Sequence, residues 1–211
     1  MIKISAMRSI PPMVEGYVRD VSLRWALAEV GLEYEVQLVD ADDRKTGSYR
    51  QRQPFGQVPW YEEDGLVLFE SGAIVLHIAE KSHHLLPKDA AARARTKSWM
   101  FAATSTIDPV IKNFEEVEYF GNDAEWARLR RPDALAAVKE RLDQLAQALG
   151  TREYLENVFT GADLLMVMAL RNLGPAEVLH AIPSLVQYVQ RCEARTGFQT
   201  ALAKHKAIYA K

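Results

Sequence analysis

The spacing of apolar residues changes once along this chain, and that change restricts the fold more than any single motif does. Over residues 1–82, stretches that alternate apolar and polar residues, as strands do, are separated by stretches with helical spacing. After a linker at 83–89, which contains Pro87, every apolar pattern is helical. The sequence therefore predicts an α/β domain over residues 1–82 and an all-helical domain over residues 90–211. A chain of 211 residues is long enough for each to have a core.

The first domain is predicted to contain seven elements in the order βαβαββα. The strands are expected at 2–6, 34–38, 58–61 and 66–69, and the helices at about 17–32, briefly within 40–53, and at 71–80. Asp64-Gly65 separates the last two strands and is a typical hairpin turn. Because a helix joins the first two strands, these are expected to be parallel, and the hairpin then adds antiparallel strands to one mixed, four-stranded sheet.

The second domain is predicted to be a bundle of helices. One long helix has an apolar stripe over 99–117, with a kink expected at Pro109. Further helices are expected at about 135–149, 164–170 and 185–192. The segment 164–170 is apolar on every side, which predicts a fully buried helix. Thr160 and Asp163 precede it at the spacing of a capping box, which is a folding device and not a site.

Composition excludes several classes of function. Apolar residues make up 48% and charged residues 26%, which is typical of a globular protein. The net charge is only −2, so binding to nucleic acid or to an anionic membrane is not expected. The one cysteine, Cys192, allows no internal disulfide and no cysteine-rich zinc site. Since residues 1–5 do not resemble a signal peptide and no stretch is long and apolar enough to span a membrane, a reducing, cytoplasmic location is expected.

A binding site is predicted at the two ends of the hairpin. A cis bond between Val58 and Pro59 would turn the Val58 backbone outward, where it can pair with an extended peptide. Glu70 and Ser71 begin the next helix, where free N–H groups and the helix dipole favour a carboxylate. Together these features predict a site for a small peptide with an anionic group. Taken singly, they are more typical of a strand-opening proline and an ordinary serine cap; it is their occurrence together, in this strand order, that favours a site.

Other chemistry has little support in the sequence. The histidines show no metal-ligand spacing; they are His77, His83, His84, His180 and His205. Neither a Gly-x-Gly-x-x-Gly motif nor a Gly-Lys-Ser/Thr loop is present, so no nucleotide site is predicted. We therefore expect neither a metal nor a nucleotide cofactor.

The combination of element order and motifs resembles the cytosolic glutathione S-transferases over nearly the whole chain. The resemblance is carried by Gln57-Val58-Pro59, by Glu70-Ser71-Gly72-Ala73-Ile74, by Thr160-x-x-Asp163, and by Arg24 to Leu32, which is similar to that family's first helix. It implies a thioredoxin-like domain that binds glutathione as co-substrate and a helical domain that provides a pocket for a small hydrophobic electrophile. It also implies a homodimer and a role in detoxification.

The resemblance assigns a role to each motif residue in the first domain. Val58, flanked by Gln57 and Pro59, would pair its backbone with the cysteinyl part of glutathione. Glu70 and Ser71 would hold the γ-glutamyl end, with Ser71 taking the carboxylate.

The catalytic position departs from the family pattern. Many members have a Ser, Cys or Tyr near the end of the first strand or the start of the first helix. Seven residues before Arg24, the spacing of the family's Ser- and Cys-containing classes, the chain has Tyr17. Five residues before Arg24, the spacing of another Cys-containing class, it has Arg19. Ser5 and Ser9 are weaker candidates. The alternative for Tyr17 is a buried aromatic residue, and for Arg19 a solvated cation.

Catalysis requires a glutathione thiolate at neutral pH. A free thiol has a pKa near 8.5, and lowering it by about two units takes roughly 2.7 kcal/mol. The Tyr17 hydroxyl and the Arg19 guanidinium could supply part of this free energy if both side chains faced the sulfur. That requires the helix to begin at or after Arg19 and the preceding turn to be extended, since alternate residues of an extended segment point the same way.

The predicted function is transfer of glutathione to a small hydrophobic electrophile, or reduction with it. The long helix of the second domain would line the electrophile pocket with Met100, Thr104 and Ile107, which have the spacing of one helix face. The alternative is a non-catalytic binding or interaction protein of the same fold, which the absence of a clear thiol-activating residue favours.

Overall fold

The computed structural model describes residues 1–121, 123–174 and 177–210, and the chain divides into two compact units. The first unit contains Met1–Leu86 together with Arg195–Lys211, and the second contains Pro87–Ala194. The division near Pro87 is close to the predicted linker. The C-terminal segment differs from the expectation. The sequence predicts that it belongs to the helical domain, whereas Arg195–Lys211 is part of the first compact unit.

The first unit is built on one four-stranded sheet. Its strands are β1 (Ile2–Met7), β2 (Tyr34–Val39), β3 (Trp60–Glu63) and β4 (Leu66–Phe69), in the order β2-β1-β3-β4. β1 and β2 are parallel, and β3 is antiparallel to both β1 and β4. The mixed sheet of the predicted thioredoxin-like fold is thereby confirmed. β3 begins two residues later than expected, so Val58 and Pro59 precede it.

The helices expected among the strands of the first unit are present in the predicted order, and the structure adds a short helix before them and one at the C-terminus. They are η1 (Pro12–Val14), α1 (Asp20–Glu29), η2 (Asp43–Lys45), α2 (Gly47–Arg50), α3 (Ser71–Glu80) and α10 (Thr196–Tyr209). α3 has the predicted bounds, whereas α1 begins three residues later than expected. The segment 40–53 forms only short helical turns, as predicted.

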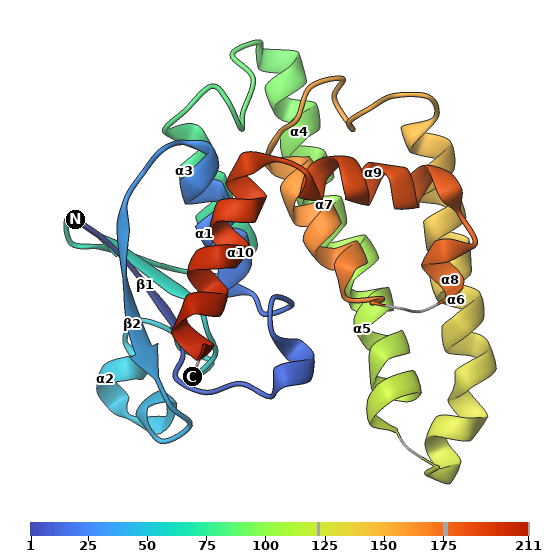
Figure 1. Ribbon diagram of the computed structural model, residues 1–211, viewed down its shortest axis with the longest axis horizontal. Coiled ribbons are helices and arrows are strands. Elements are labelled where there is room, and N and C mark those ends of the chain that lie inside the picture. Colours follow the sequence, from blue (N-terminus) through green and yellow to red (C-terminus); the bar gives the residue numbers. More distant parts are fainter. Residues whose placement is uncertain (122, 175–176, 211) are drawn as a thin grey trace. The chain divides into compact units, whose positions relative to one another are not determined.

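The C-terminal helix α10 lies alongside α1 (Figure 1). Trp25 and Phe198 meet edge to face with ring centroids 4.9 Å apart. Arg195 donates two hydrogen bonds of 2.8 Å to the Glu29 carboxylate. At Gly197 a Cβ would lie only 2.6 Å from that carboxylate, so a larger residue here would have to displace the Glu29 side chain. Aromatic packing and a bidentate ion pair thus attach α10 to the first unit.

All regular secondary structure among the described residues of the second unit is helical. Its elements are α4 (Ala90–Ala102), η3 (Ala103–Ile107), α5 (Asp108–Glu115), η4 (Glu116–Phe120), α6 (Glu125–Leu149), α7 (Gly161–Arg171), α8 (Glu177–His180) and α9 (Pro183–Glu193). The predicted long helix is interrupted by two π-helical turns, η3 and η4. Pro109 lies two residues after the first of these, and its missing N–H explains why the regular helix is disturbed there.

Helix α7 is buried along nearly its whole length, as its all-apolar sequence predicts. The predicted capping box is present: the Thr160 N–H donates to Asp163 Oδ2 at 2.9 Å, and Thr160 Oγ1 accepts from the Ala162 N–H at 3.3 Å. The second Asp163 oxygen accepts from the Leu155 N–H and from the Tyr188 hydroxyl. Asp163 therefore joins α7, the preceding loop and α9.

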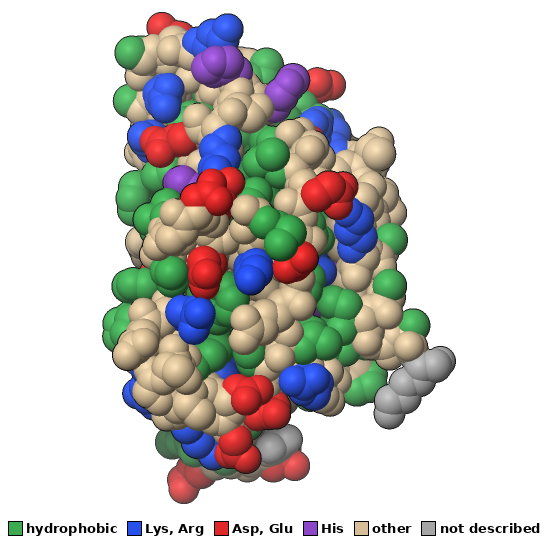
Figure 2. All heavy atoms as spheres, turned by 90° about the vertical axis from the view of Figure 1, so that its left-hand side faces the viewer, with side chains coloured by type: hydrophobic (Ala, Val, Ile, Leu, Met, Phe, Trp, Pro, Cys, Tyr) green, Lys and Arg blue, Asp and Glu red, His purple; other side chains and the backbone are tan. Residues whose placement is uncertain are grey.

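Surface charge is mixed. On the face shown in Figure 2, basic and acidic side chains are interspersed and neither sign dominates. Among the described residues, no helix has both the length and the apolar composition that crossing a membrane requires.

Candidate functional site

The segment before β3 is held in place from both sides. The Val58-Pro59 peptide bond is cis, as predicted from the sequence. Before it, the Tyr49 hydroxyl donates to the Gln57 carbonyl at 2.6 Å. After it, the Trp60 N–H donates to Ser5 Oγ at 2.9 Å, and Val58 packs against the cluster that contains Trp60. The backbone around Val58 is thus anchored to the sheet.

The hairpin register brings Val58 and Ser71 to the same end of the sheet. Trp60 is opposite Phe69 in the β3–β4 ladder. Val58 lies two residues before Trp60 and Ser71 two residues after Phe69, so they occupy corresponding positions just beyond the ladder. The structure therefore brings together the two parts of the predicted peptide site, although 12 intervening residues separate them in sequence.

Helix α3 begins at Ser71 without a side-chain cap. The residue before it, Glu70, has φ +68°, a conformation that non-glycine residues rarely adopt, and its side chain makes no capping hydrogen bond. Its carbonyl accepts from the Ile74 N–H, which is the first hydrogen bond of the helix. The first N–H groups of a ten-residue helix carry partial positive charge and suit an anion.

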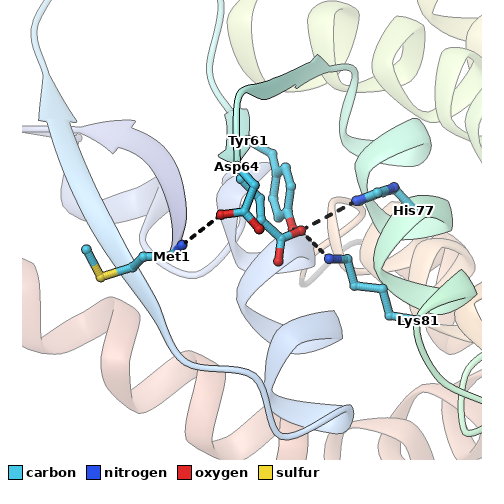
Figure 3. Close-up of polar contacts among 6 residues, drawn as sticks. Met1, Tyr61, Asp64, His77 and Lys81 are labelled. Atoms are coloured by element: carbon cyan, nitrogen blue, oxygen red, sulfur yellow. Dashed lines mark hydrogen bonds and ion pairs between the residues drawn. The ribbon is translucent and has the colours of Figure 1, made fainter.

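A polar cluster attaches the hairpin to α3. The Glu63 carboxylate pairs with Lys81, the C-cap of α3, lies 3.9 Å from His77 Nε2 and accepts from the Tyr61 hydroxyl at 2.7 Å. Figure 3 shows Tyr61 of the hairpin close to His77 and Lys81. The Lys81 ammonium and the Tyr61 hydroxyl lower the pKa of Glu63, whereas burial, followed by the hydrogen bond to Glu63, raises the pKa of Tyr61. At the tip of the hairpin the Met1 ammonium contacts Asp64.

This cluster predicts a pH-dependent contribution to stability. Because folding lowers the pKa of Glu63, the contribution is present above its unfolded pKa of about 4.3 and is lost as the pH falls through the lower folded value. We expect Lys81→Met to lower the free energy of unfolding by about 0.5–1 kcal/mol at pH 7, since the pair is partly exposed. Urea unfolding at pH 7 and pH 3 measures this; an equal loss at both would show that the ion pair is not the cause. Lys139→Met, at an exposed position on α6, is the control.

The two candidate thiol-activating residues lie at the start of α1. The helix begins at Asp20, so the requirement that it begin at or after Arg19 is met. The expected extended turn is wrong: Arg19 has helical dihedral angles, and the Val21 N–H donates to the Val18 carbonyl. Tyr17 is therefore connected to the helix by tight turns and not by an extended segment. Its side chain is exposed.

Of the two weaker candidates, Ser5 is occupied elsewhere. It is fully buried, and its oxygen accepts the Trp60 N–H. Ser9 is exposed in the loop that follows β1.

Helix α10 anchors both ends of the loop that carries Tyr17, which the sequence did not predict. His205 Nε2 accepts from the Gly16 N–H at 3.2 Å, and Nδ1, which must then carry the proton, faces Asp20 Oδ2 at 3.4 Å. At the other end of the loop, the Tyr209 hydroxyl donates to the Met7 carbonyl at 2.7 Å. Burial raises the pKa of Tyr209 to about 12, so this hydroxyl keeps its proton at neutral pH.

Arg24 of α1 also contacts Asp20, the carboxylate that faces His205. Its Nε donates to Asp20 Oδ2 at 2.7 Å, and both side chains are almost fully buried. The signal for this pair was present in the sequence: Asp20 and Arg24 are four residues apart on a helix whose neighbouring positions are apolar. The third member, His205, is 185 residues from Asp20 and had no local signal.

The predicted electrophile residues lie in α4 and η3. Met100 and Ile107 are buried, and Thr104 is half-buried with its hydroxyl within 3.3 Å of the Met100 and Phe101 carbonyls. The π-helical turn changes their angular spacing from that of the regular helix the sequence predicts. Their role in a pocket stays a prediction. No group of three or more potential metal ligands lies together in the described part of the chain.

Comparison with known proteins identifies the family. The model of the glutathione S-transferase N-terminal domain matches residues 16–80. The chain is 30% identical to a glutathione S-transferase-like protein, LUC7, of a Fusarium species over 171 residues, which are 76% of this chain and 77% of that protein. It is 29% identical to glutathione S-transferase GST-4.5 of Xanthomonas campestris over 188 residues, or 86% and 90% of the two chains.

Solved structures agree. A glutathione transferase of Burkholderia graminis, crystallised with two glutathione molecules per subunit, superposes with a TM-score of 0.83 at 25% identity, over 95% of this chain and 87% of that one. Glutathione transferase F7 of Populus trichocarpa shares the fold with a TM-score of 0.82 at 24% identity, over 97% and 99%. With its thioredoxin-like sheet and helical second unit, the chain belongs to the glutathione S-transferase superfamily and is classed with its transferase enzymes.

Proposed function

We propose that this chain binds glutathione along Val58 and Ser71 and transfers its sulfur to a small hydrophobic electrophile, or uses it as a reductant. The cysteinyl backbone of glutathione pairs with Val58, flanked by Gln57 and Pro59. The γ-glutamyl carboxylate is held by Ser71 and the start of α3, beside Glu70. We further propose that the protein works as a homodimer in the cytoplasm, without a metal.

One observation carries this proposal: Val58 and the uncapped start of α3 lie at the same end of the β3–β4 hairpin. An extended peptide that pairs with Val58 can therefore place a carboxylate at the positive end of the helix. Two relatives at 25% identity, from Burkholderia graminis and Pseudomonas fluorescens, were crystallised with glutathione bound, which supports the same ligand here.

The thiol is proposed to be activated at the start of α1. Arg19 would contribute charge and Tyr17 a hydroxyl donor, both of which favour the thiolate. The hydrogen bond from Gly16 to His205 fixes the backbone immediately before Tyr17. His205 and Asp20 are thus positioning residues for this loop, and Met100, Thr104 and Ile107 are proposed to receive the electrophile.

The test is the ultraviolet thiolate absorbance of bound glutathione, titrated against pH. The proposal predicts an apparent thiol pKa about two units below the free value near 8.5. Tyr17→Phe and Arg19→Ala are each expected to raise it by at least half a unit, roughly 0.7 kcal/mol. The controls are Tyr119→Phe and Lys139→Ala, which change exposed residues of the second unit and should leave it unchanged.

The same titration distinguishes the second candidate function, a non-catalytic glutathione-binding protein. The observation that favours it is that no clear thiol-activating Ser, Cys or Tyr stands in its usual setting. A bound thiol with an ordinary pKa would support that function and contradict catalysis. A lowered pKa that neither variant changes would exclude Tyr17 and Arg19 as activating residues and favour Ser9 or the backbone N–H groups of the loop.

A further inference from the structure

The loop that carries Tyr17 contains a backbone N–H whose acceptor is a titratable side chain. Gly16 directly precedes Tyr17, is buried and has φ +83°, in the region that favours glycine. Its N–H donates to His205 Nε2 at 3.2 Å, and the His205 side chain has no exposed surface. The two residues are 189 positions apart in sequence and both belong to the first unit, so this hydrogen bond fixes the loop to α10.

The hydrogen bond requires a neutral imidazole whose proton is on Nδ1. Nε2 accepts only without a proton, so the ring proton lies on Nδ1 and faces Asp20 Oδ2 at 3.4 Å. Arg24 Nε donates to the same carboxylate oxygen at 2.7 Å. A second proton, on Nε2, would point at the Gly16 N–H, so that two donors would meet. Protonation of the ring therefore removes the hydrogen bond to the loop.

The charged and titratable groups near the imidazole belong to α1, to α10 and to the loop. They are Asp20, Arg24, Tyr209, Lys204, Lys206 and Glu15. Asp20 and Arg24 are paired with each other and almost fully buried, whereas both lysines are exposed. The Tyr209 ring meets the imidazole edge to face, with centroids 5.1 Å apart, and burial followed by the charge of Asp20 raises the pKa of this tyrosine. Asp20 thus faces the imidazole at Nδ1, whereas Gly16 uses the other ring nitrogen.

We propose that His205 is an acid-sensitive anchor of the Tyr17 loop. The neutral imidazole holds Gly16, and protonation of Nε2 releases it, because a buried N–H without an acceptor is costly and the loop must move to give it one. The ring itself stays in place, since the Asp20 carboxylate attracts an imidazolium more strongly than a neutral imidazole. Release would move Tyr17 away from the bound thiol, a consequence that rests on the proposed function.

The test is amide hydrogen exchange, followed by NMR on the full chain without glutathione at pH 7.5 and pH 5.5, the range in which histidines ordinarily change charge. Protection factors remove the intrinsic pH dependence of exchange. We expect protection of the Gly16 amide to fall at least tenfold at the lower pH. The amide of Leu27, which is buried within α1, should keep its protection, so release of the loop is distinguishable from loss of overall stability.

Two variants show whether His205 is the group that titrates. In His205→Gln the side-chain carbonyl can accept from Gly16 but does not titrate, so protection of Gly16 should change less than about twofold between the two pH values. His83→Gln, which changes an exposed histidine after α3, is the matched control and should behave like the unchanged protein.

Equal protection of Gly16 at both pH values in the unchanged protein would overturn the proposal, and this comparison needs no variant to fold. A loss of protection in His205→Gln as large as in the unchanged protein would also overturn it. Because exchange is measured without glutathione, the result is independent of the proposed transferase function, which the thiolate titration tests by itself.

Discussion

Replacement of Asp163 by alanine is expected to lower the free energy of unfolding by about 3–5 kcal/mol. The fully buried carboxylate accepts from the N–H groups of Leu155 and Thr160 and from the hydroxyls of Thr160 and Tyr188, and it thereby joins the loop before α7 to α9. Alanine leaves these four donors buried without that acceptor. Burial raises the pKa of Asp163, and these hydrogen bonds oppose that rise because they stabilise the ionised carboxylate.

Urea unfolding of the whole chain measures the effect, and two milder variants keep it measurable if Asp163→Ala does not fold. Thr160→Ala and Tyr188→Phe each remove one partner and should cost about 1 kcal/mol. Asp143→Ala, at an exposed position on α6, should change stability by less than about 0.5 kcal/mol. If Asp163→Ala cost no more than Asp143→Ala, the network would not be what holds α7 and α9 together.

Replacement of Ser71 by alanine is expected to weaken glutathione binding by about 1–3 kcal/mol, or roughly 5- to 150-fold. In the proposed complex the Ser71 hydroxyl donates to the γ-glutamyl carboxylate, and a hydrogen bond to a charged group is worth more than one between neutral groups. Isothermal titration calorimetry with glutathione gives the affinity directly.

Two variants define what that result means. Ser71→Thr keeps the hydroxyl and should retain most of the affinity, whereas Ser98→Ala removes an exposed hydroxyl of α4 and should have no effect. Wild-type affinity in a folded Ser71→Ala protein would contradict the assigned carboxylate site. Comparable weakening by Ser98→Ala would show that the loss is not specific to α3.

Sequence patterns of a few neighbouring residues were sufficient to predict the strands, turns and helices that depend only on those residues. The alternation in β1 and β2, the Asp64-Gly65 turn and the bounds of α3 depend on residues adjacent in sequence, and all are found in the structure. The capping box of α7 is likewise a four-residue motif. The π-helical turns η3 and η4 were not predicted, because apolar spacing over a long helix does not reveal a single inserted residue.

The site was predictable only in part, for a related reason. Val58 and Ser71 are brought together by a hairpin whose register follows from its two-residue turn, so their proximity could be inferred. The anchoring of the Tyr17 loop depends on His205 and Tyr209, which reach it only because α10 packs on α1. No periodicity in α10 shows which helix it will contact. Arg19 has helical dihedral angles because hydrogen bonds from Val21 to Val18 and from Ser22 to Arg19 continue the turn into α1, so the expected extended turn is wrong.

The central claim is that glutathione lies along Val58 and the start of α3, and a crystal structure of the protein with glutathione tests it most directly. The account predicts two backbone hydrogen bonds between Val58 and the cysteinyl residue of the ligand, and a γ-glutamyl carboxylate within 2.7–3.2 Å of the Ser71 hydroxyl or N–H. It also predicts the sulfur within hydrogen-bond reach of Tyr17 or Arg19. Glutathione bound with its carboxylate away from α3, or bound only in another part of the molecule, would contradict the account.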